Sequence, residues 1–158
     1  MNYKVSESVP RIGIKIPGVT IKHWYIDTKE EKSKYLKAES EIWPDDPTGV
    51  EKLREYKNNP FWKAITAFYN DEMIIGSILV WKVKNENIGT IEDVFVKPYW
   101  RRHGLAKHLI TEGIRHLRNC NLEYAQLLVE TKNQSALKLY KFLGFEVKKE
   151  ERRYWVDL

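Results

Sequence analysis

The chain has 158 residues, of which 42% are hydrophobic and 31% are charged, with 27 Lys and Arg against 22 Asp and Glu. This composition is typical of one soluble folded domain and excludes a disordered chain. The apolar runs are far shorter than the roughly 20 residues that a membrane-spanning helix needs. The single cysteine, Cys120, excludes an internal disulfide, and residues 1–14 lack the apolar core of a secretory signal, so a cytoplasmic location is expected.

The positive charge is unevenly distributed along the chain. Residues 1–100 carry 15 basic and 15 acidic side chains, whereas residues 101–158 carry 12 basic and 7 acidic ones. The whole excess of +5 therefore lies in the last third. Such a surplus suits either nucleic acid or a small molecule that carries phosphate groups.

The first third of the chain predicts one strand and two helices. Val19–Ile26 alternates as a strand does, and Asp27 or Thr28 can cap a helix that runs to about Glu41 with Leu36 on its buried side. Two prolines and a glycine make residues 43–49 a loop. Thr48 followed by Glu51 is a capping-box pattern, which predicts a second helix to about Lys57.

The rest of the chain alternates strands with helices. Short polar turns predict an antiparallel meander of three strands at Phe61–Tyr69, Met73–Val83 and Gly89–Val96. Apolar residues at helical spacing predict helices at Arg102–Asn119 and Ser135–Leu143, the second ending at Gly144. Further strands are predicted at Tyr124–Val129, Phe145–Glu150 and Arg152–Val156. The element order predicts a mixed α/β sheet domain.

The turn between Val96 and the helix that follows has the features of an anion site. The first amides of a helix lack partners within the helix, and the helix dipole favours negative charge there. Gly104 and Ala106 are small enough to let a pyrophosphate approach, and three basic side chains add positive charge: Arg101, Arg102 and Lys107. Neither a dinucleotide fingerprint nor a Walker loop is present. On these features alone, an ordinary basic helix start explains the turn equally well.

Two motifs in order carry a resemblance to a known family. The first is Val96-x-Pro98-x-x-Arg101-x-x-Gly104-x-Ala106, and the second is Asn133-x-x-Ala136-x-x-Leu139-Tyr140-x-x-x-Gly144-Phe145. Together they resemble the acetyl-CoA pyrophosphate motif and the later helix motif of the GNAT superfamily of N-acetyltransferases. Ala106 replaces a commoner glycine, and His103 lies inside the turn.

The resemblance implies a GNAT-like acyl-CoA N-acyltransferase fold, an α+β domain with a mostly antiparallel central sheet flanked by helices. The domain would occupy residues 19–158 after an extension at 1–18. Acetyl-CoA would be the cosubstrate, with no metal. The backbone at Phe95 or Val96 would polarise the thioester, and the residues that would hold the pyrophosphate are Arg101, Arg102, His103, Gly104, Leu105, Ala106 and Lys107. Asn133 would reach the pantetheine, cap its helix, or do both.

The same resemblance suggests the catalytic groups. Tyr140 matches the family tyrosine that protonates the departing thiolate, for which a free pKa of ~10 is suitable, although periodicity alone favours a core tyrosine. Glu92 is the preferred general base, directly or through water. Strand alternation sends Glu92 and Asp93 to opposite faces, so only one of them is expected to face the cleft. The alternatives are solvated charges at the strand end and a base made of water alone.

The acceptor side is expected at the loop after the first helix, where Trp43, Asp45 and Asp46 would receive a cationic amine, together with Asp93. A solvated acidic loop with a packed tryptophan is the alternative. The four histidines and one cysteine form no zinc-binding pattern.

The activity expected from these features is acetyl transfer to a primary amine of a small cationic molecule, by direct attack in a ternary complex. A protein or peptide N-acetyltransferase is the nearest alternative. A module that binds acyl-CoA or nucleic acid without catalysis is the alternative from another class. The preferred interpretation includes neither a nucleic-acid nor a membrane partner, and the family's frequent dimers allow a homodimer.

Overall fold

The computed structural model describes residues 16–128, 134–148 and 153–158. The strands follow the predicted order and are β1 (Val19–Trp24), β2 (Lys63–Tyr69), β3 (Met73–Lys82), β4 (Ile88–Val96), β5 (Tyr124–Leu128), β6 (Glu146–Lys148) and β7 (Arg153–Asp157). The helices are α1 (Lys29–Ile42), α2 (Gly49–Lys57), α3 (Leu105–Asn119) and α4 (Gln134–Phe142), with a short 3-10 helix, η2, at Pro98–Trp100.

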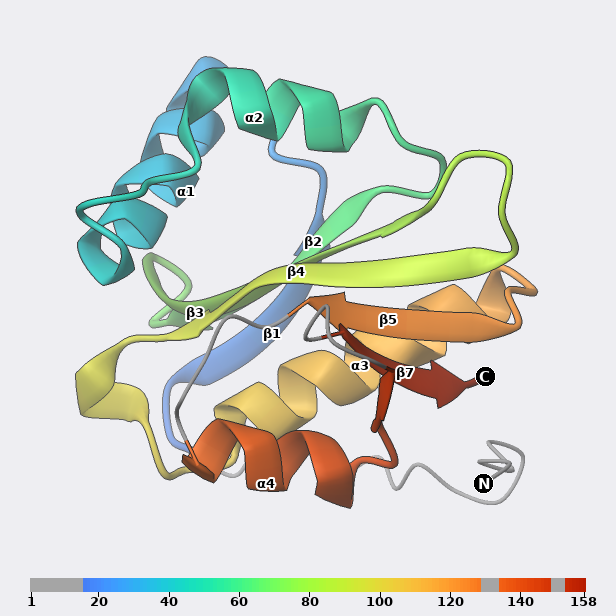
Figure 1. Ribbon diagram of the computed structural model, residues 1–158. Coiled ribbons are helices and arrows are strands. Elements are labelled where there is room, and N and C mark those ends of the chain that lie inside the picture. Colours follow the sequence, from blue (N-terminus) through green and yellow to red (C-terminus); the bar gives the residue numbers. More distant parts are fainter. Residues whose placement is uncertain (1–15, 129–133, 149–152) are drawn as a thin grey trace.

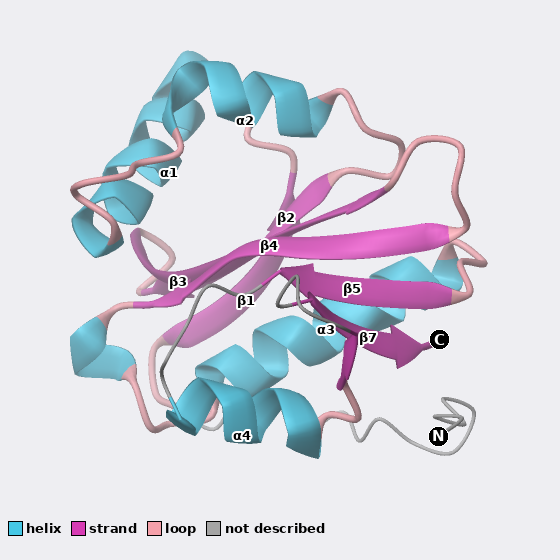
Figure 2. Cartoon of the chain, in the orientation of Figure 1, coloured by secondary structure: helices cyan, strands magenta, loops and turns pink. Residues whose placement is uncertain are grey.

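The strands of the described residues form one sheet in the order β1-β2-β3-β4-β5-β7-β6. Neighbouring strands are antiparallel except β4 and β5, which are parallel. The one parallel pair requires a crossover, and α3 supplies it. The predicted fold class, a mixed and mostly antiparallel sheet flanked by helices, is confirmed (Figures 1 and 2).

The helices form two layers, one on each face of the sheet. Figure 1 shows α1 and α2 above β4, with α3 and α4 below it. Each helix layer covers a separate apolar cluster on its face of the sheet. The cluster under α1 and α2 includes Ile26, Tyr35, Leu53, Leu79, Trp81 and Phe95. The cluster on the other face includes Ile78, Val80, Ile91, Leu109, Ile114, Leu117 and Tyr140, and the partly buried Ile16 packs against it.

Strand β4 contains a bulge close to its carboxyl end. Leu79 pairs with Glu92, but Ser77 pairs with Phe95, so β4 has one extra residue between these two positions. Asp93 adopts a φ of 50°, in the left-handed region that aspartate tolerates better than most residues. A bulge of this kind re-aims the side chains beside it.

Helix α1 begins as predicted, with a capping box between Thr28 and Glu31. Its buried face differs from the expected one, because Leu36 is only half-buried. The buried residues are Tyr35, Ala38 and Glu39. The apolar stripe of α1 therefore includes a carboxyl group.

Helix α2 starts where the capping box predicted it, but Thr48 makes no side-chain cap and points elsewhere. Helix α3 starts at Leu105 instead of Arg102. The preceding residues are held by η2 and by the positive φ angles of Arg102 and Gly104, which no helix accommodates.

Candidate active site

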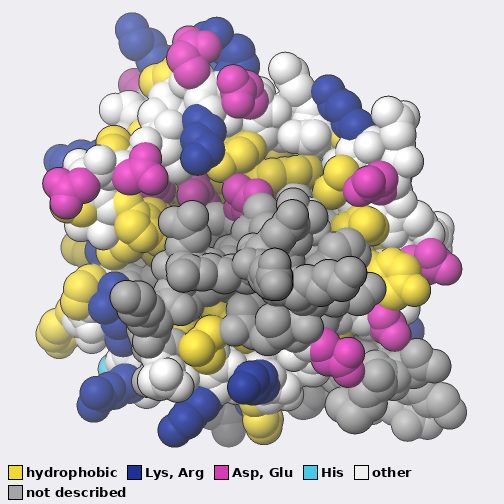
Figure 3. All heavy atoms as spheres, in the orientation of Figure 1, with side chains coloured by type: hydrophobic (Ala, Val, Ile, Leu, Met, Phe, Trp, Pro, Cys, Tyr) yellow, Lys and Arg dark blue, Asp and Glu magenta, His cyan; other side chains and the backbone are white. Residues whose placement is uncertain are grey.

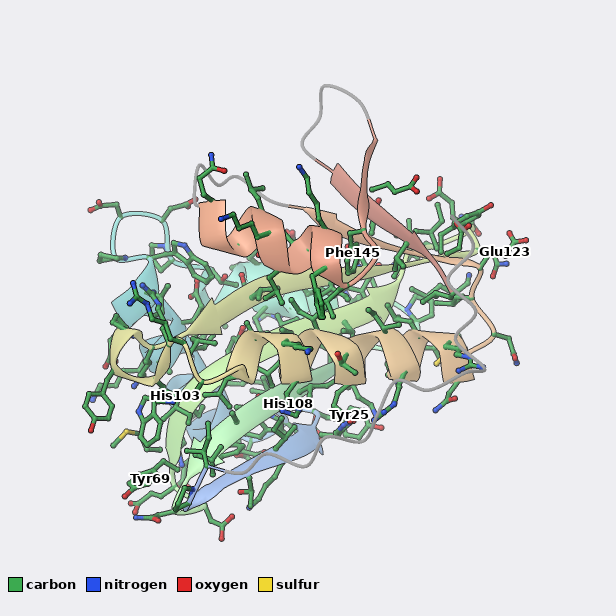
Figure 4. All side chains as sticks on the ribbon, turned by 90° about the horizontal axis from the view of Figure 1, so that it is seen from below. Tyr25, Tyr69, His103, His108, Glu123 and Phe145 are labelled. Atoms are coloured by element: carbon green, nitrogen blue, oxygen red, sulfur yellow. The ribbon has the colours of Figure 1, made fainter. Side chains whose placement is uncertain are left out.

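The turn before α3 has an open backbone surface at its glycine. Gly104 caps the helix with a φ of 78°, and a Cβ added there would meet no atom within 4 Å. The first α3 hydrogen bond runs from the His108 amide to the Gly104 carbonyl at 3.1 Å. The amides of residues 105–107 therefore precede the hydrogen-bonded part of the helix and are oriented toward its N-terminal end. Figure 4 shows His103 in this turn. The open backbone and the oriented amides fit a pyrophosphate group.

Positive charge surrounds the same turn. Arg101, Arg102 and His103 are exposed, and Arg101 Nε donates to the Val96 carbonyl at 2.9 Å, which ties the guanidinium to the end of β4. Lys107 Nζ lies 4.6 Å from the ring centroid of Phe142 on α4. The Leu105 side chain is buried in the core, so this residue offers only its backbone to a ligand. On the face seen in Figure 3, Lys and Arg side chains lie along the lower left edge, and others lie at the top of the view.

Strands β4 and β5 are paired over the first residues of β4. Their parallel pairing begins at Ile88 with Tyr124 and ends at Ile91 with Leu127 in the described residues. The segment of β4 from the bulge to Val96 keeps its pairing with β3 on the other side. On the β5 side, the structure describes the neighbouring strand only as far as Leu128. Phe95 and Val96, the two predicted backbone contacts, lie in this segment.

The second motif is only partly visible. Asn133 lies outside the described residues. Tyr140 lies on α4, is buried within the α3-side cluster, and has its ring 6.5 Å from that of Phe145. Figure 4 shows Phe145 beneath α4, next to the sheet. Gly144 has the positive φ of 93° that the predicted end of the helix requires. A proton-donating role for Tyr140 stays a prediction.

The β4 bulge brings two acidic side chains to one face. Glu92 pairs with Leu79, which belongs to the cluster under α1 and α2, and Asp93 accepts hydrogen bonds from Tyr35 and Thr48 on that same side. The expectation that alternation separates Glu92 from Asp93 is therefore wrong. The extra residue of the bulge interrupts the two-residue period on which that expectation depends.

A polar network links α1, the start of α2 and the bulge. Tyr35 Oη donates to Asp93 Oδ2 at 3.0 Å. The Thr48 hydroxyl lies 3.0 Å from Glu39 Oε1 and 2.9 Å from Asp93 Oδ2. The Thr48 amide donates to Glu39 Oε2 at 3.0 Å, and Tyr56 hydrogen-bonds to Glu92. Thr48 therefore connects Glu39 on α1 with Asp93 on β4, and its side chain does not cap α2.

Burial governs the ionisation of this network. Removal from water raises the pKa of the Glu39, Glu92 and Asp93 carboxyls, and in each case hydrogen bonds from Thr48, Tyr35 or Tyr56 offset part of the rise. Burial and the neighbouring carboxylates also raise the pKa of the Tyr35 and Tyr56 phenols. The carboxyls on this face are thus better proton acceptors than exposed ones.

An aromatic wall stands beside the carboxyls. The ring of Trp43 meets that of Phe95 edge-on with centroids 6.0 Å apart, and Tyr35 lies 6.3 Å from Phe95 on another side. Trp43 is 37% exposed, so part of the indole faces solvent. Asp45 and Asp46 are exposed on the loop that follows. Trp43 and Tyr35 therefore pack against Phe95, and Tyr35 also contacts Asp93, while Asp45 and Asp46 stay at the surface.

Sequence reasoning missed Tyr35, Glu39, Thr48 and Tyr56. One signal for Glu39 was available, because it lies four residues after Tyr35, with Ala38 between them, on the buried stripe of an amphipathic helix. A carboxyl group at such a position has to find a polar partner. No comparable signal identified Thr48, whose spacing to Glu51 imitates a capping box.

Two further findings bear on partners. Within the described parts of the chain, no group of three or more His, Cys, Asp or Glu side chains could hold a metal ion. Over the same residues, no helix is both long and apolar enough to cross a membrane.

Comparison with known proteins identifies the family. A model described as "Acetyltransferase (GNAT) family" matches residues 20–145. The chain therefore belongs to the GNAT family of acetyltransferases, and the resemblance seen in the two sequence motifs is confirmed. The cosubstrate of this family is acetyl-CoA, in agreement with the expected cofactor.

Curated relatives are similar over part of their length. A mycothiol acetyltransferase of Thermomonospora curvata is 30% identical over 148 residues, which cover 89% of this chain and 46% of the relative. A mycothiol acetyltransferase of Nocardiopsis dassonvillei is 40% identical over 60 residues, or 38% of this chain and 18% of the relative. The chain thus spans less than half the length of these relatives.

Solved structures share the fold. A GNAT acetyltransferase from Staphylococcus aureus superposes with a TM-score of 0.71 at 18% identity, covering 89% of this chain and 99% of the other. The PaiA N-acetyltransferase of Thermoplasma acidophilum, solved with coenzyme A, has a TM-score of 0.69 at 18% identity over 89% and 99% of the two chains. These superpositions show that the fold is shared.

Proposed function

We propose that the protein transfers an acetyl group from acetyl-CoA to a primary amine of a small cationic molecule, by direct attack in a ternary complex. The turn from Arg101 to Lys107 binds the pyrophosphate through its amides and basic side chains. The backbone of Phe95 and Val96, beyond the described pairing of β4 with β5, aligns the thioester arm. Acetyl-CoA supplies an activated acyl group, and the remaining steps belong to side chains of this chain.

The observation that carries the acceptor assignment is the pair of carboxyls at the β4 bulge. Glu92 and Asp93 lie on the face of the sheet that also carries Phe95, and the ring of the exposed Trp43 packs against Phe95. An ammonium group is attracted both by carboxylates and by the face of an indole ring. The Trp43 ring and the two carboxyls therefore favour a positively charged acceptor.

In this proposal Glu92 takes the proton that the ammonium group must lose before it can attack. Its pKa is raised by burial, which brings its proton affinity closer to what a general base requires near neutral pH. Asp93 holds the charge of the acceptor. Tyr140 returns a proton to the departing sulfur. Glu92 acts directly or through one water molecule.

The test is a screen of amines at a fixed acetyl-CoA concentration. The rate of acetyl transfer is measured from the release of the free thiol of coenzyme A. The panel contains monoamines, diamines, aminoglycosides, and peptides with a lysine or a free N-terminus. We expect small amines with a second positive charge to give the highest kcat/KM. Turnover of peptides alone would replace the small-molecule acceptor with a protein acceptor.

Glu92→Gln is the matched variant for this assay, because it keeps the size of the side chain and removes its basicity. We expect kcat to fall on the order of 10²-fold, the usual contribution of a general base. Glu123→Gln is the control, since Glu123 is exposed and lies near the C-terminal end of α3, far from His103 (Figure 4). Equal kcat values for the two variants would leave water as the only base.

A further inference from the structure

The hydroxyl of Thr48 lies between two carboxyl groups that come from different layers of the fold. Its Oγ1 is 3.0 Å from Glu39 Oε1 on α1, and 2.9 Å and 3.2 Å from the two carboxyl oxygens of Asp93 on β4. Glu39 is 1% exposed, so bulk water does not separate these groups. All three contacts have hydrogen-bond lengths.

Counting hydrogen atoms shows that this arrangement needs one more proton than the hydroxyl supplies. A hydroxyl donates one hydrogen, and an ionised carboxylate only accepts. With Glu39 and Asp93 both ionised, Thr48 could donate to one of them, and the other would face a bare oxygen lone pair at about the same distance. Tyr35 also donates to Asp93 Oδ2, and the Thr48 amide donates to both oxygens of Glu39, but neither donor places a hydrogen atom between Thr48 Oγ1 and a carboxyl oxygen.

We infer that Glu39 and Asp93 share a single proton through the Thr48 hydroxyl, and that Glu39 is a positioning residue that sets the protonation state of Asp93. In one arrangement Glu39 is protonated, donates to Thr48 Oγ1, and Thr48 donates to Asp93. In the other the direction of both hydrogen bonds reverses and Asp93 carries the proton. One proton and the hydroxyl hydrogen satisfy both contacts in either arrangement.

The charged and titratable groups around the bridge agree with a retained proton. Glu92 on β4 adds a third carboxyl, and Tyr35 and Tyr56 contribute neutral phenols from α1 and α2. Lys52 on α2 is the cation whose attraction stabilises the ionised forms of Glu39, Glu92 and Asp93, and its side chain is exposed. Burial raises the pKa of both bridged carboxyls, in the direction that a shared proton requires.

The inference extends the proposed function, because it assigns the state in which Asp93 meets a cationic acceptor. Protonated Glu39 leaves Asp93 ionised and able to attract an ammonium group. Reversal of the bridge neutralises Asp93. Glu39 touches no substrate in this scheme and acts through Thr48.

The direct test is a carboxyl ¹³C NMR titration of the intact protein, with the Glu39 and Asp93 signals assigned. In the wild type we expect each of the two carbons to respond to both titration steps, with the later step above the usual range of exposed carboxyls. Thr48→Val keeps the shape of the side chain without the hydroxyl, and it should abolish the shared response. Thr48→Ser should retain it.

Glu39→Gln tests the direction of the effect. The side-chain amide of this variant can donate to Thr48 as protonated Glu39 does, so Thr48 stays a donor to Asp93 and the Asp93 midpoint should move down by about one pH unit or more. Glu41→Gln is the control, because Glu41 is half-exposed on the same helix and pairs with Lys97 at 3.1 Å. It should leave the Asp93 midpoint unchanged.

Two single-step titrations, each within the ordinary carboxyl range, would overturn the inference, as would an unchanged Asp93 midpoint in Glu39→Gln. This readout does not need turnover. A coupled titration in a protein that acetylates no amine would retain the shared proton and refute the proposed function. Activity without a coupled titration would support the proposed function and refute the shared proton. In an active protein, Glu39→Gln should also shift the acidic limb of the kcat profile to lower pH.

Discussion

The hydroxyl of Tyr35 donates a hydrogen bond of 3.0 Å to Asp93, across 58 positions in the sequence. This contact joins the buried face of α1 to the bulge of β4, and it orients a carboxyl that strand alternation alone would have turned away. Removing the hydroxyl leaves Asp93 short of one donor in a part-buried setting. The contact therefore links the stability of the domain to the ionisation of its candidate acceptor site.

Tyr35→Phe should destabilise the protein by about 1–2 kcal/mol, the usual cost of a lost hydrogen bond with a buried partner. The same change should raise the pKa of Asp93, because the Tyr35 hydrogen bond holds that pKa down. Urea unfolding measures the first effect. Tyr25→Phe is the control, since Tyr25 is 56% exposed. Equal unfolding free energies for the two variants would contradict a stabilising role for the contact.

Gly104 and Gly49 form a matched pair for testing the cofactor site. Both have a positive φ, 78° and 76°, and a Cβ added at either would meet no atom within 4 Å. Alanine at each position should therefore cost about 1–2 kcal/mol of stability through the backbone alone. Only Gly104→Ala should also weaken binding of coenzyme A in titration calorimetry, because only this Cβ would project toward the bound pyrophosphate. Equal affinity in both variants would move the phosphate site elsewhere.

Tyr140→Phe should lower kcat on the order of 10²-fold and leave the affinity for acetyl-CoA unchanged, since the ring would still pack against Phe145. Tyr69→Phe is the control, because Tyr69 ends β2, which β3 and β4 separate from β5, and its ring packs against Trp100. Steady-state rates and binding titrations separate the two parameters. Full turnover in Tyr140→Phe would remove the proton-donating role from this residue.

Stability should fall as pH rises through the upper part of the carboxyl range. The pKa values of Glu39, Glu92 and Asp93 are raised in the folded protein, so the folded state binds more protons and is favoured below the unfolded values. This contribution is lost as pH increases past the folded values. His108 and His116 have lowered pKa values and work in the opposite direction, losing stability as pH falls.

The two effects can be separated by comparing wild type with Glu39→Gln from pH 4 to pH 8. The histidine contribution is common to both proteins and cancels in the difference. We expect the free energy of unfolding to decline less steeply with pH in the variant. Parallel curves would mean that Glu39 has the same pKa in the folded and unfolded states.

The fold could be predicted closely because its signals are local. The Thr28 cap, the turn at Asn70 and Asp71, and the glycine after α4 each mark a boundary through backbone chemistry that the sequence displays. The turn before α3 could also be predicted, since its glycine and basic residues are close together in the sequence. The start of α3 lies a few residues later than predicted, because η2 and the turn after it precede the helix.

The polar network of the candidate acceptor site was harder to predict because its parts meet only through tertiary structure. One extra residue in β4 turns the Asp93 side chain to the face of the sheet that Glu92 occupies. Neither a glutamate nor an aspartate in a strand marks the position of a bulge. The sequence predicts a helix-capping role for Thr48, because a hydroxyl at that spacing from Glu51 is typical of a capping box. Its actual partners lie 9 and 45 positions away.

The two apolar clusters on opposite faces of the sheet have a consequence for divergence within the family. The layer of α1 and α2 carries Tyr35, Glu39, Trp43 and Thr48, whereas the turn before α3 is anchored to the other cluster through Leu105. Substitutions in the upper layer can therefore accumulate without disturbing the packing that supports the phosphate turn. Under the proposed function, specificity for other amines would change through substitutions in that layer, while the turn before α3 keeps its packing.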